Sequence, residues 1–189
     1  MQYYKASLRQ HYKSLRAALQ PEELLEKSIA IANQCLGLPL WDHRNFHVFL
    51  SSQKNAEVNT EPLVTVLQGK EKTTVVPKMA PKEQLQHCIL EEDTLLQCNA
   101  YGIPEPVTGK LLNPQKIDVV FVPLLAFDTT GQRVGYGKGN YDRFLKSCKP
   151  TVVSVGLSFF EPVEKINDCH SHDVPLHYVV SPQQQYSFT

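Results

Sequence analysis

The sequence predicts an α/β fold, a three-layer single domain over residues 1–189 with a mostly parallel sheet flanked by helices. Three observations support this class. Strand-like segments alternate with amphipathic helical segments along the chain. The strongest strand candidate, residues 117–122, is β-branched and almost wholly apolar, as strands in the middle of parallel sheets are. No internal repeat or low-complexity linker divides the 189 residues, and this length buries one sizeable core.

The first predicted helix covers residues 4–19. Apolar positions recur there at helical spacing, namely Leu8, Tyr12, Leu15 and Leu19. A neighbouring stripe is cationic and consists of Lys5, Arg9, Lys13 and Arg16. We interpret the stripe at Lys13 and Arg16 as a solvated helix face. A second helix is expected from Pro21 to about Leu36, because proline and acidic residues favour a helix start.

The remaining elements follow in alternation. Strands are predicted at residues 46–50, 73–76, 87–91, 95–98, 117–122, 151–156 and 178–181. A short helix is expected over residues 60–68, with Thr60 as its N-cap and Gly69 as its stop. Another helix is expected over residues 141–147. Because ligands of parallel sheets gather outside the carboxyl ends of the strands, the segment after Val122 is where a site is expected.

The composition excludes several classes of protein. Lysine plus arginine equals aspartate plus glutamate at 19 each, so no global field attracts nucleic acid or an anionic membrane. No apolar run approaches the ~20 residues of a membrane span. The first residues lack the apolar core of a secretory signal. The five cysteines show no paired spacing and are interpreted as reduced thiols, and we expect a cytoplasmic monomer.

The segment 131–145 carries most of the chemical information. Glycines lie at positions 131, 135, 137 and 139, and they allow consecutive backbone N–H groups to turn toward one anion. Arg133 and Lys138 add positive charge, and Asp142 follows as a candidate magnesium ligand. We interpret the segment as a polyphosphate site. The alternative is a glycine-rich surface hairpin followed by a helix.

This loop matches neither common nucleotide fingerprint. A P-loop requires serine or threonine after its lysine, where this chain has Gly139. The dinucleotide pattern requires a third glycine, where this chain has Asn140. The loop therefore points to a phosphate site of another kind.

Three further positions and one segment carry side chains that could serve a site. Glu57 is a loop cap or a ligand contact, and Asp128 is interpreted as stabilising its own turn. Lys78 is a candidate for a phosphate or glutamate-tail contact. The segment Cys169-His170-Ser-His172-Asp173, with His177, could suggest zinc, but adjacent ligands rarely chelate one ion. We interpret it as a polar loop with Asp173 facing magnesium.

Several short motifs occur in one order over nearly the whole chain. They are Lys5-x-x-x-Arg9, Glu57-Val-x-Thr60, Tyr101-Gly-Ile-Pro-Glu-Pro106, Val122-Pro123 with Phe127-Asp128, Arg133-x-Gly135-x-Gly137-Lys138-Gly139-x-Tyr141-Asp142, and Asp173-Val-Pro-Leu176. On these motifs the sequence resembles the 5-formyltetrahydrofolate cyclo-ligase family, whose members are also called 5,10-methenyltetrahydrofolate synthetases.

The resemblance implies an ATP- and Mg²⁺-dependent ligase. Such an enzyme cyclises 5-formyltetrahydrofolate, with or without a polyglutamate tail, to 5,10-methenyltetrahydrofolate and releases ADP and phosphate. It does so through phosphorylation of the formyl oxygen and attack by N10. The resemblance implies ATP contacts from Lys5, Arg9, Arg133, Val134, Gly135, Tyr136, Gly137, Lys138, Gly139, Asn140 and Tyr141. It implies substrate contacts from Glu57, Tyr136, Gly137, Lys138, Gly139 and Asn140, and magnesium ligands in Asp142 and Asp173.

Among these residues, Lys138, Arg133 and Tyr141 are the expected catalytic ones. One position departs from the family pattern, because most members carry an aromatic residue where this chain has Asn140. That change puts stacking on the folate or nucleotide in question and leaves backbone contacts intact.

Two rival functions fit the residues without the resemblance. A sugar-phosphate isomerase or CoA-transferase-like enzyme also holds phosphates on a glycine loop, but it would need no ATP hydrolysis. A non-catalytic nucleotide-binding regulator would bind ATP without folate-dependent turnover. The absence of an aromatic and basic surface motif argues against a nucleic-acid module.

Overall fold

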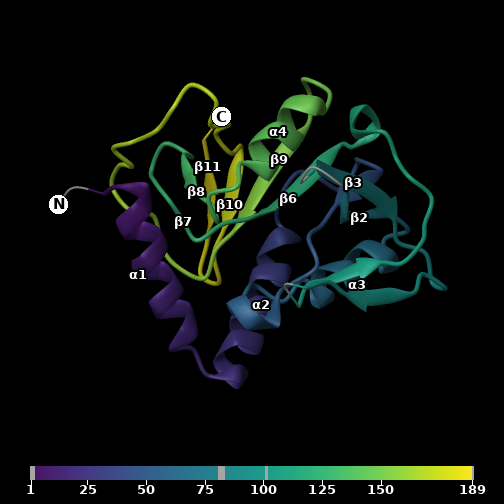
Figure 1. Cartoon of the computed structure of the whole chain (residues 1–189), viewed down its shortest axis with the longest axis horizontal. Coiled ribbons are helices and arrows are strands. Elements are labelled where there is room, and N and C mark those ends of the chain that lie inside the picture. The colour runs from purple at the N-terminus through teal and green to yellow at the C-terminus, as the bar shows by residue number, and fades with distance from the viewer. Residues whose placement is uncertain (1–2, 81–83, 101, 189) are drawn as a thin grey trace.

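A computed structural model describes residues 3–80, 84–100 and 102–188 (Figure 1). Within these residues a seven-stranded sheet has the order β11-β10-β9-β6-β1-β2-β3. Its strands are β11 (Gln185–Ser187), β10 (Tyr178–Val180), β9 (Val153–Leu157), β6 (Val119–Pro123), β1 (Asn45–His47), β2 (Thr73–Ala80) and β3 (Gln84–Ile89). The five inner strands are parallel, and β3 and β11 are antiparallel edges. The predicted α/β class with a mostly parallel sheet is confirmed.

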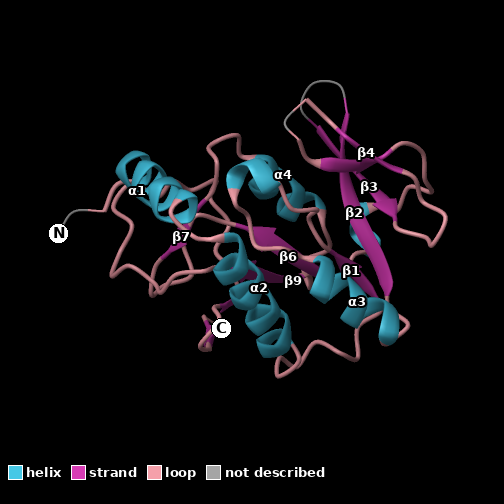
Figure 2. Cartoon of the chain, turned by 90° about the horizontal axis from the view of Figure 1, so that it is seen from below, coloured by secondary structure: helices cyan, strands magenta, loops and turns pink. Residues whose placement is uncertain are grey.

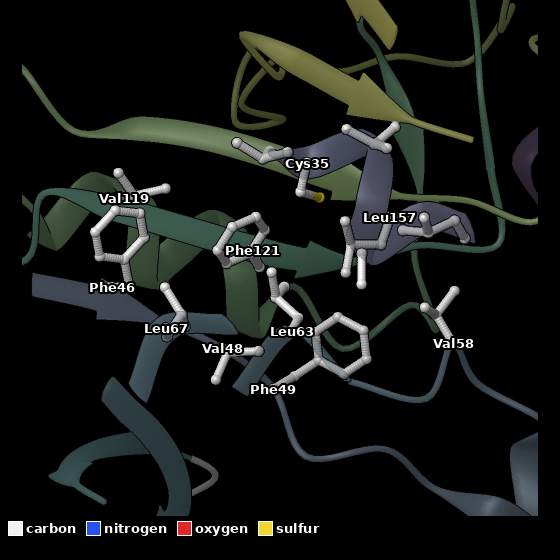
Figure 3. Packing of buried hydrophobic residues seen from close by; sticks show 14 of the residues in the cluster. Cys35, Phe46, Val48, Phe49, Val58, Leu63, Leu67, Val119, Phe121 and Leu157 are labelled. Atoms are coloured by element: carbon white, nitrogen blue, oxygen red, sulfur yellow. The ribbon is translucent and has the colours of Figure 1, made fainter. Parts of the chain in front are cut away.

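Helices cover both faces of this sheet. The helices α2 (Pro21–Cys35) and α3 (Glu61–Gly69) lie on one face, and α4 (Asn140–Ser147) lies on the other (Figure 2). Alternate strand residues separate accordingly. Phe46, Val119 and Phe121 pack with α2 and α3 in one core cluster (Figure 3). Val120 and Val122 pack with α4 in a second cluster. The predicted three layers therefore follow from the two-residue period of buried strands.

The helix α1 (Lys5–Ala17) lies beside a small antiparallel hairpin. This hairpin is formed by β7 (Ala126–Phe127) and β8 (Arg133–Val134). Leu8 and Tyr12 of α1 pack against Leu125 and Val134 in a third cluster. The short elements η1 (Gln53–Asn55), η3 (Pro114–Lys116), β4 (Leu96–Cys98) and β5 (Pro104–Pro106) lie in connections.

Two expectations for α1 are corrected by this packing. Arg16 is 2% exposed, and it donates to the Leu124 carbonyl and to the Tyr136 hydroxyl, so it is not on a solvated face. Leu15 was expected in the apolar stripe and is instead exposed. The hairpin β7–β8 packs against α1 on its cationic side. Contacts with the rest of the chain, more than the apolar spacing of the helix, therefore determine which side of α1 is buried.

Two local expectations also change. Thr60 precedes α3, but its hydroxyl donates to the Phe49 carbonyl instead of capping the helix, and Asn59 accepts from the Glu61 N–H. The strand predicted at 73–76 extends through Pro77 to Ala80. Proline is tolerated there because β1 ends at His47, opposite Val75, so no ladder bond is lost.

The prolines of the segment 101–106 favour a rigid turn. In the structure the segment contains the strand β5, which pairs with β4. Tyr101 itself lies outside the described residues. The short edge strand β11 was not predicted. The five cysteines are free thiols. None of the described helices is long and apolar enough to cross a membrane.

Candidate active site

A cavity of about 510 Å³ opens at the carboxyl ends of the parallel strands. Phe49 and Leu50 reach it just after β1, Pro77 from β2, and Pro123 from the end of β6. Ligand sites in enzymes usually have volumes of about 300–1,000 Å³. The position after β6 is the one expected from the parallel topology.

The cavity brings together nearly all of the residues predicted from sequence. Its lining includes Lys5, Arg9, Glu57, Arg133, Gly135, Tyr136, Gly137, Lys138, Gly139, Asn140, Tyr141, Asp142 and Asp173. Val134 is the exception, because its side chain is fully buried against α1. Its carbonyl accepts from the Leu125 N–H at 2.7 Å within the hairpin region.

The glycine loop crosses the mouth of the cavity in a conformation that glycine favours. Gly137 and Gly139 have φ values of +98° and +65°. Arg9 supports the loop from α1, since its Nε donates to the Gly135 carbonyl at 2.9 Å. The Arg9 guanidinium also lies so close to Gly137 that a Cβ there would be 3.5 Å from Cζ. The loop is therefore held by the first helix.

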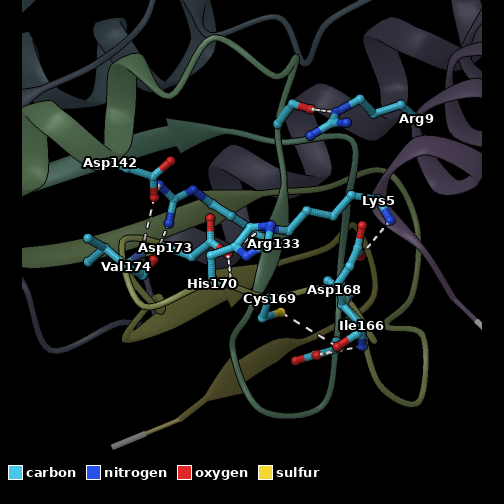
Figure 4. Close-up of polar contacts among 12 residues, drawn as sticks. Lys5, Arg9, Arg133, Asp142, Ile166, Asp168, Cys169, His170, Asp173 and Val174 are labelled. Carbon is cyan, nitrogen blue, oxygen red and sulfur yellow. Dashed lines mark hydrogen bonds and ion pairs between the residues drawn. The ribbon is translucent and has the colours of Figure 1, made fainter.

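Arg133 and Asp142 form a largely buried ion pair in the site (Figure 4). Arg133 Nη2 lies 2.6 Å from Asp142 Oδ1, and Nη1 donates to the Val174 carbonyl. The same Asp142 oxygen accepts from the Val174 N–H at 3.0 Å. Burial lowers the pKa of Arg133, and Asp142 opposes that shift. The pair thus ties the start of α4 to the segment that follows Asp173.

A second ion pair joins Lys5 of α1 to Asp173 (Figure 4). Asp173 Oδ2 also accepts from the His170 N–H at 2.6 Å. Burial alone raises the pKa of Asp173, but these hydrogen bonds and the Lys5 charge lower it overall. The Lys5 backbone N–H donates to Asp168 Oδ1 at 2.8 Å. Tyr3 and Asn167 exchange two further bonds, so the start of α1 is clamped to residues 167–173.

Asp142 and Asp173 suit magnesium better than zinc. Magnesium takes oxygen ligands, and it commonly uses one or two carboxylates together with water and substrate phosphates. Both carboxylates line the cavity. In the described part of the chain no group of three or more His, Cys, Asp or Glu side chains converges on one point. His170 and His172 line the cavity with their rings stacked at 5.2 Å.

Glu57 reaches the cavity from the loop after β1 and is 7% exposed. Its Oε2 accepts from the Ser52 N–H at 2.8 Å, so it stabilises its loop and also lines the site. The Tyr136 hydroxyl accepts from Arg16 at 2.9 Å. Burial and then the nearby Glu57 charge raise the pKa of Tyr136, while Arg16 opposes them. Burial and Glu57 likewise raise the pKa of Tyr141.

The end of the cavity away from α1, on the side of β2 and β3, is apolar and was not predicted (Figures 1 and 2). Met79 of β2, Leu85 of β3 and Ile103 form its wall with Phe49 and Leu50. These are ordinary strand and loop residues, and nothing in their spacing indicates a ligand. The motif around residues 102–106 was the one feature of the sequence that pointed to this wall, because it contains Ile103.

Two polar residues accompany that apolar wall. Asn99 Nδ2 donates to Glu105 Oε1 at 2.8 Å, and the same oxygen accepts from the Met79 N–H at 3.2 Å. Both side chains line the cavity. Lys78, by contrast, is not among the lining residues, and its Nζ donates to the Val107 carbonyl at 2.6 Å.

Asp128 serves its turn as predicted. Its Oδ1 accepts from the Thr130 and Gln132 N–H groups at 2.9 and 3.1 Å. Its Oδ2 accepts from the Ile166 N–H at 2.9 Å. Asp128 is fully buried and shapes the base of the glycine loop.

An α/β domain with a glycine loop and paired charges around a cavity at the carboxyl ends of its strands has its site where α/β enzymes bind small ligands. The model described as the 5-formyltetrahydrofolate cyclo-ligase family matches residues 2–182. This chain belongs to that family and is therefore an enzyme, a ligase, which excludes a non-catalytic nucleotide-binding regulator.

Curated relatives agree along the chain. It is 28% identical to the 5-formyltetrahydrofolate cyclo-ligase of Mus musculus, over 93% of this chain and 92% of the relative. It is 29% identical to that of Escherichia coli K12, over 92% and 97%. Among solved structures, the 5,10-methenyltetrahydrofolate synthetase of Aquifex aeolicus aligns with a TM-score of 0.84 at 29% identity, covering 97% of this chain and 92% of that chain. The Mycoplasma pneumoniae synthetase, at 20% identity, shares the fold with a TM-score of 0.74, covering 94% and 98%.

Proposed function

We propose that this chain catalyses the ATP-dependent cyclisation of 5-formyltetrahydrofolate to 5,10-methenyltetrahydrofolate, with release of ADP and phosphate. The observation that supports it best is one cavity with two chemically different ends. Cations and a glycine loop form one end, and an apolar wall forms the other. A reaction that transfers a phosphoryl group from a polyphosphate to a flat heterocyclic substrate requires a charged end for the first and an apolar end for the second.

The charged end is proposed to bind ATP. Lys138 is exposed on the glycine loop and lines the cavity, whereas Lys5 and Arg9 approach from α1. Phosphoryl transfer is catalysed mainly by alignment and by neutralisation of phosphate charge. Arg133 is bonded to Asp142 and Val174, so its proposed role is to hold the first turn of α4 beside the phosphates.

The apolar end is proposed to hold the folate. Met79, Leu85 and Ile103 offer surface to the pterin ring, and Glu57 offers a buried carboxylate to hydrogen-bond donors. Tyr136 and Asn140 line the same cavity from the glycine loop and the start of α4, and the proposed junction of the formyl group and the γ-phosphate lies beside them. The substitution of Asn140 for an aromatic residue leaves this junction without a stacking ring on that side.

The formyl oxygen of the substrate is a weak nucleophile and must be aligned with the γ-phosphorus. Transfer of the phosphoryl group to that oxygen gives an imidate phosphate and ADP. N10 then attacks the formyl carbon and loses its proton, and phosphate leaves with the former formyl oxygen. The chain contributes by holding both reactants and by excluding water from the activated carbon.

Asp142 and Asp173 would hold magnesium, which supplies charge neutralisation at the phosphate oxygens. Asp142 Oδ1 is already bonded to Arg133 and Val174, so the carboxylate is fixed in orientation before any metal arrives. We also propose that the enzyme works as a cytoplasmic monomer without nucleic acid or membrane partners, as its balanced charge suggests.

The test is to incubate the chain with 5-formyltetrahydrofolate, ATP and Mg²⁺ and to follow the absorbance of the methenyl-folate product. Phosphate and ADP should appear in equal amounts with the product, and omission of any one component should stop all three. Product formation without ATP would show that the cyclisation is not coupled to ATP and would overturn the proposed reaction. Phosphate release that is independent of folate would indicate a plain ATPase.

A further inference from the structure

Two buried histidines lie behind the cavity wall, on the sheet face that α4 covers. His47 belongs to β1 and is 0% exposed, and His87 belongs to β3 and is 5% exposed. Their ring centroids are 5.2 Å apart. Neither residue lines the cavity. Their position therefore gives them no direct contact with a ligand.

Both rings pack against the same residue of α4. The Phe144 ring stacks on His87 at 4.0 Å and lies 4.6 Å from His47. Tyr141, one turn earlier in the helix, lies 6.0 Å from Phe144 and 6.2 Å from His47. The first turn of α4 carries Asn140, Tyr141 and Asp142 into the cavity. The histidine pair is thus the support on which this turn rests.

The pair also adjoins the apolar wall. Across the ladder between β2 and β3, His87 lies opposite Pro77, which lines the cavity. Leu85, two positions along β3 on the same face, lines it as well. A shift of His87 would therefore move the wall and the α4 turn together.

The rings are packed as neutral groups. Within the described residues, both nitrogens of His47 and Nδ1 of His87 have no hydrogen-bond partner, and neither does the Tyr141 hydroxyl. A protonated imidazole carries two N–H donors and needs acceptors or water. Burial lowers the pKa of His87 to about 4, and burial followed by repulsion from His87 lowers that of His47 well below its usual value.

Among the residues that the structure describes, no carboxylate offsets this burial. From α4 the titratable group that faces His47 is Tyr141, whose own pKa responds to Glu57 and Arg133. The charged residues of α4 point elsewhere, since Asp142 pairs with Arg133 while Arg143 and Lys146 are exposed.

The strands beside the pair bring no charge either. On β2, Lys78 alternates to the opposite face and bonds the Val107 carbonyl. β1 contributes no charged group other than His47 itself, and β6 faces the pair with Val120 and Val122. The two imidazoles are each other's nearest titratable neighbours.

We propose that His47 and His87 are positioning residues, which in their uncharged form seat the first turn of α4 against the sheet and thereby hold Tyr141 and Asp142 at the site. Protonation of the pair unseats that turn. The catalytic consequence rests on the function proposed above, whereas the movement of α4 does not.

The direction of the pH effect follows from the shift. A folded-state pKa below the unfolded value of 6.5 means that stabilisation is present above about pH 6.5 and is lost as pH falls toward 4. When the pH falls from about 7 to about 5, protonation of His87 alone increases the population of open states, in which this side chain is exposed, by roughly twentyfold relative to the closed state. His47 adds to this effect. Opening of α4 should therefore increase before the whole chain unfolds.

Hydrogen exchange measured at about pH 7 and about pH 5, corrected for intrinsic rates, tests this directly. In the wild type, opening of segment 140–147 should increase on the order of twentyfold or more on acidification. The helix α2 should change much less. In the double variant His47→Gln/His87→Phe, which keeps a ring against Phe144, the acid-induced opening of 140–147 should disappear. The exposed-histidine control, His11→Gln, should behave as the wild type does.

The acid limb of kcat/KM for 5-formyltetrahydrofolate should shift to lower pH in the double variant, with activity at neutral pH retained within about threefold. Equal opening of α2 and α4, or an unchanged acid response in the double variant, would overturn the proposal. If the double variant lacks a cooperative melt, the single variant His87→Phe takes its place. In that variant the acid-induced opening of segment 140–147 must be smaller than in the wild type, and an equal opening would overturn the proposal. A chain without folate turnover refutes the proposed function and leaves the exchange test intact.

Discussion

The two ends of the cavity are built in different ways. At the charged end, the ion pair Lys5–Asp173 joins segments that are 168 positions apart, and the pair Arg133–Asp142 joins β8 to the first turn of α4. At the other end, apolar side chains such as Met79 and Ile103 only pack beside one another. At the charged end, ligand binding depends on a few charged groups that other side chains cannot replace. At the apolar end, many side chains each contribute a small part. Substitutions should therefore have abrupt effects at the first end and graded effects at the second.

Arg133→Ala should have the largest effect, on activity and on stability together. It removes one partner of a largely buried pair, and breaking such a pair costs about 3–5 kcal/mol when the remaining charge stays buried. The side chains of Arg133 and Asp142 are 6% and 22% exposed, so we expect about 3 kcal/mol. For a domain of this size the melting temperature should fall by roughly 6–12 °C.

Calorimetry and the cyclisation assay measure these two effects of Arg133→Ala. The matched control is Lys27→Ala, which breaks the exposed pair Lys27–Glu23 and should cost under about 0.5 kcal/mol. An unchanged melting temperature in Arg133→Ala would show that the ion pair does not fix the two segments. From the sequence Arg133 was expected as a catalytic residue, and the burial of its ion pair adds an effect on stability to that expectation.

Lys138→Ala should separate activity from stability. Lys138 is exposed on the glycine loop, so its removal should leave the melting temperature within about 1 °C. Loss of one charge-assisted phosphate contact costs about 1.5–3 kcal/mol, or roughly ten- to hundredfold in kcat/KM. Steady-state kinetics with varied ATP measures it, and near-wild-type kinetics would remove Lys138 from the phosphate site.

Asp142→Asn should reduce activity by about tenfold at limiting magnesium and recover partly when magnesium is raised. Asparagine keeps an oxygen for the Val174 N–H but loses the charge that pairs with Arg133. Titration of activity against Mg²⁺ at fixed ATP measures the shift. A variant with normal magnesium dependence and a lowered melting temperature would show that Asp142 acts only through its structure.

Met79→Ala should have the smallest effect of this series. Truncation of one side chain in an apolar wall removes about 1 kcal/mol of contact, so KM for the folate should rise about fivefold. KM for ATP should stay the same, because Met79 lies at the far end from the glycine loop. The control Leu96→Ala removes an exposed side chain of β4 outside the cavity. A larger effect on ATP than on folate would reverse the assignment of the two ends.

The same contrast explains what could be predicted from sequence. Because glycine, lysine, arginine and aspartate at such spacing are typical of a phosphate site, the residues of the charged end could be predicted from the sequence. Met79 and Leu85 look like any strand residues, and they reach the site only because β2 and β3 extend past the end of β1. Their role depends on strand lengths, which the residue pattern does not encode.

The fold shows the same division. The parallel inner strands and the helices α2, α3 and α4 were predictable from periodicity, which burial on two faces enforces. Arg16 was not predictable, because its burial depends on the Leu124 carbonyl and the Tyr136 hydroxyl more than a hundred positions away. Val134 was implied as an ATP contact by its place in the glycine motif, but the hairpin turns its side chain into the core.

The clamp between α1 and residues 167–173 has a consequence for synthesis on the ribosome. Lys5 and Asp173 are separated by 168 positions. At translation rates of about 5–20 residues per second, Lys5 waits roughly ten to thirty seconds for its partner. Throughout that interval the nascent chain presents a cationic helix without the carboxylate that neutralises it. The cavity, and with it any capture of nucleotide, is complete only after residues 167–173 have left the exit tunnel.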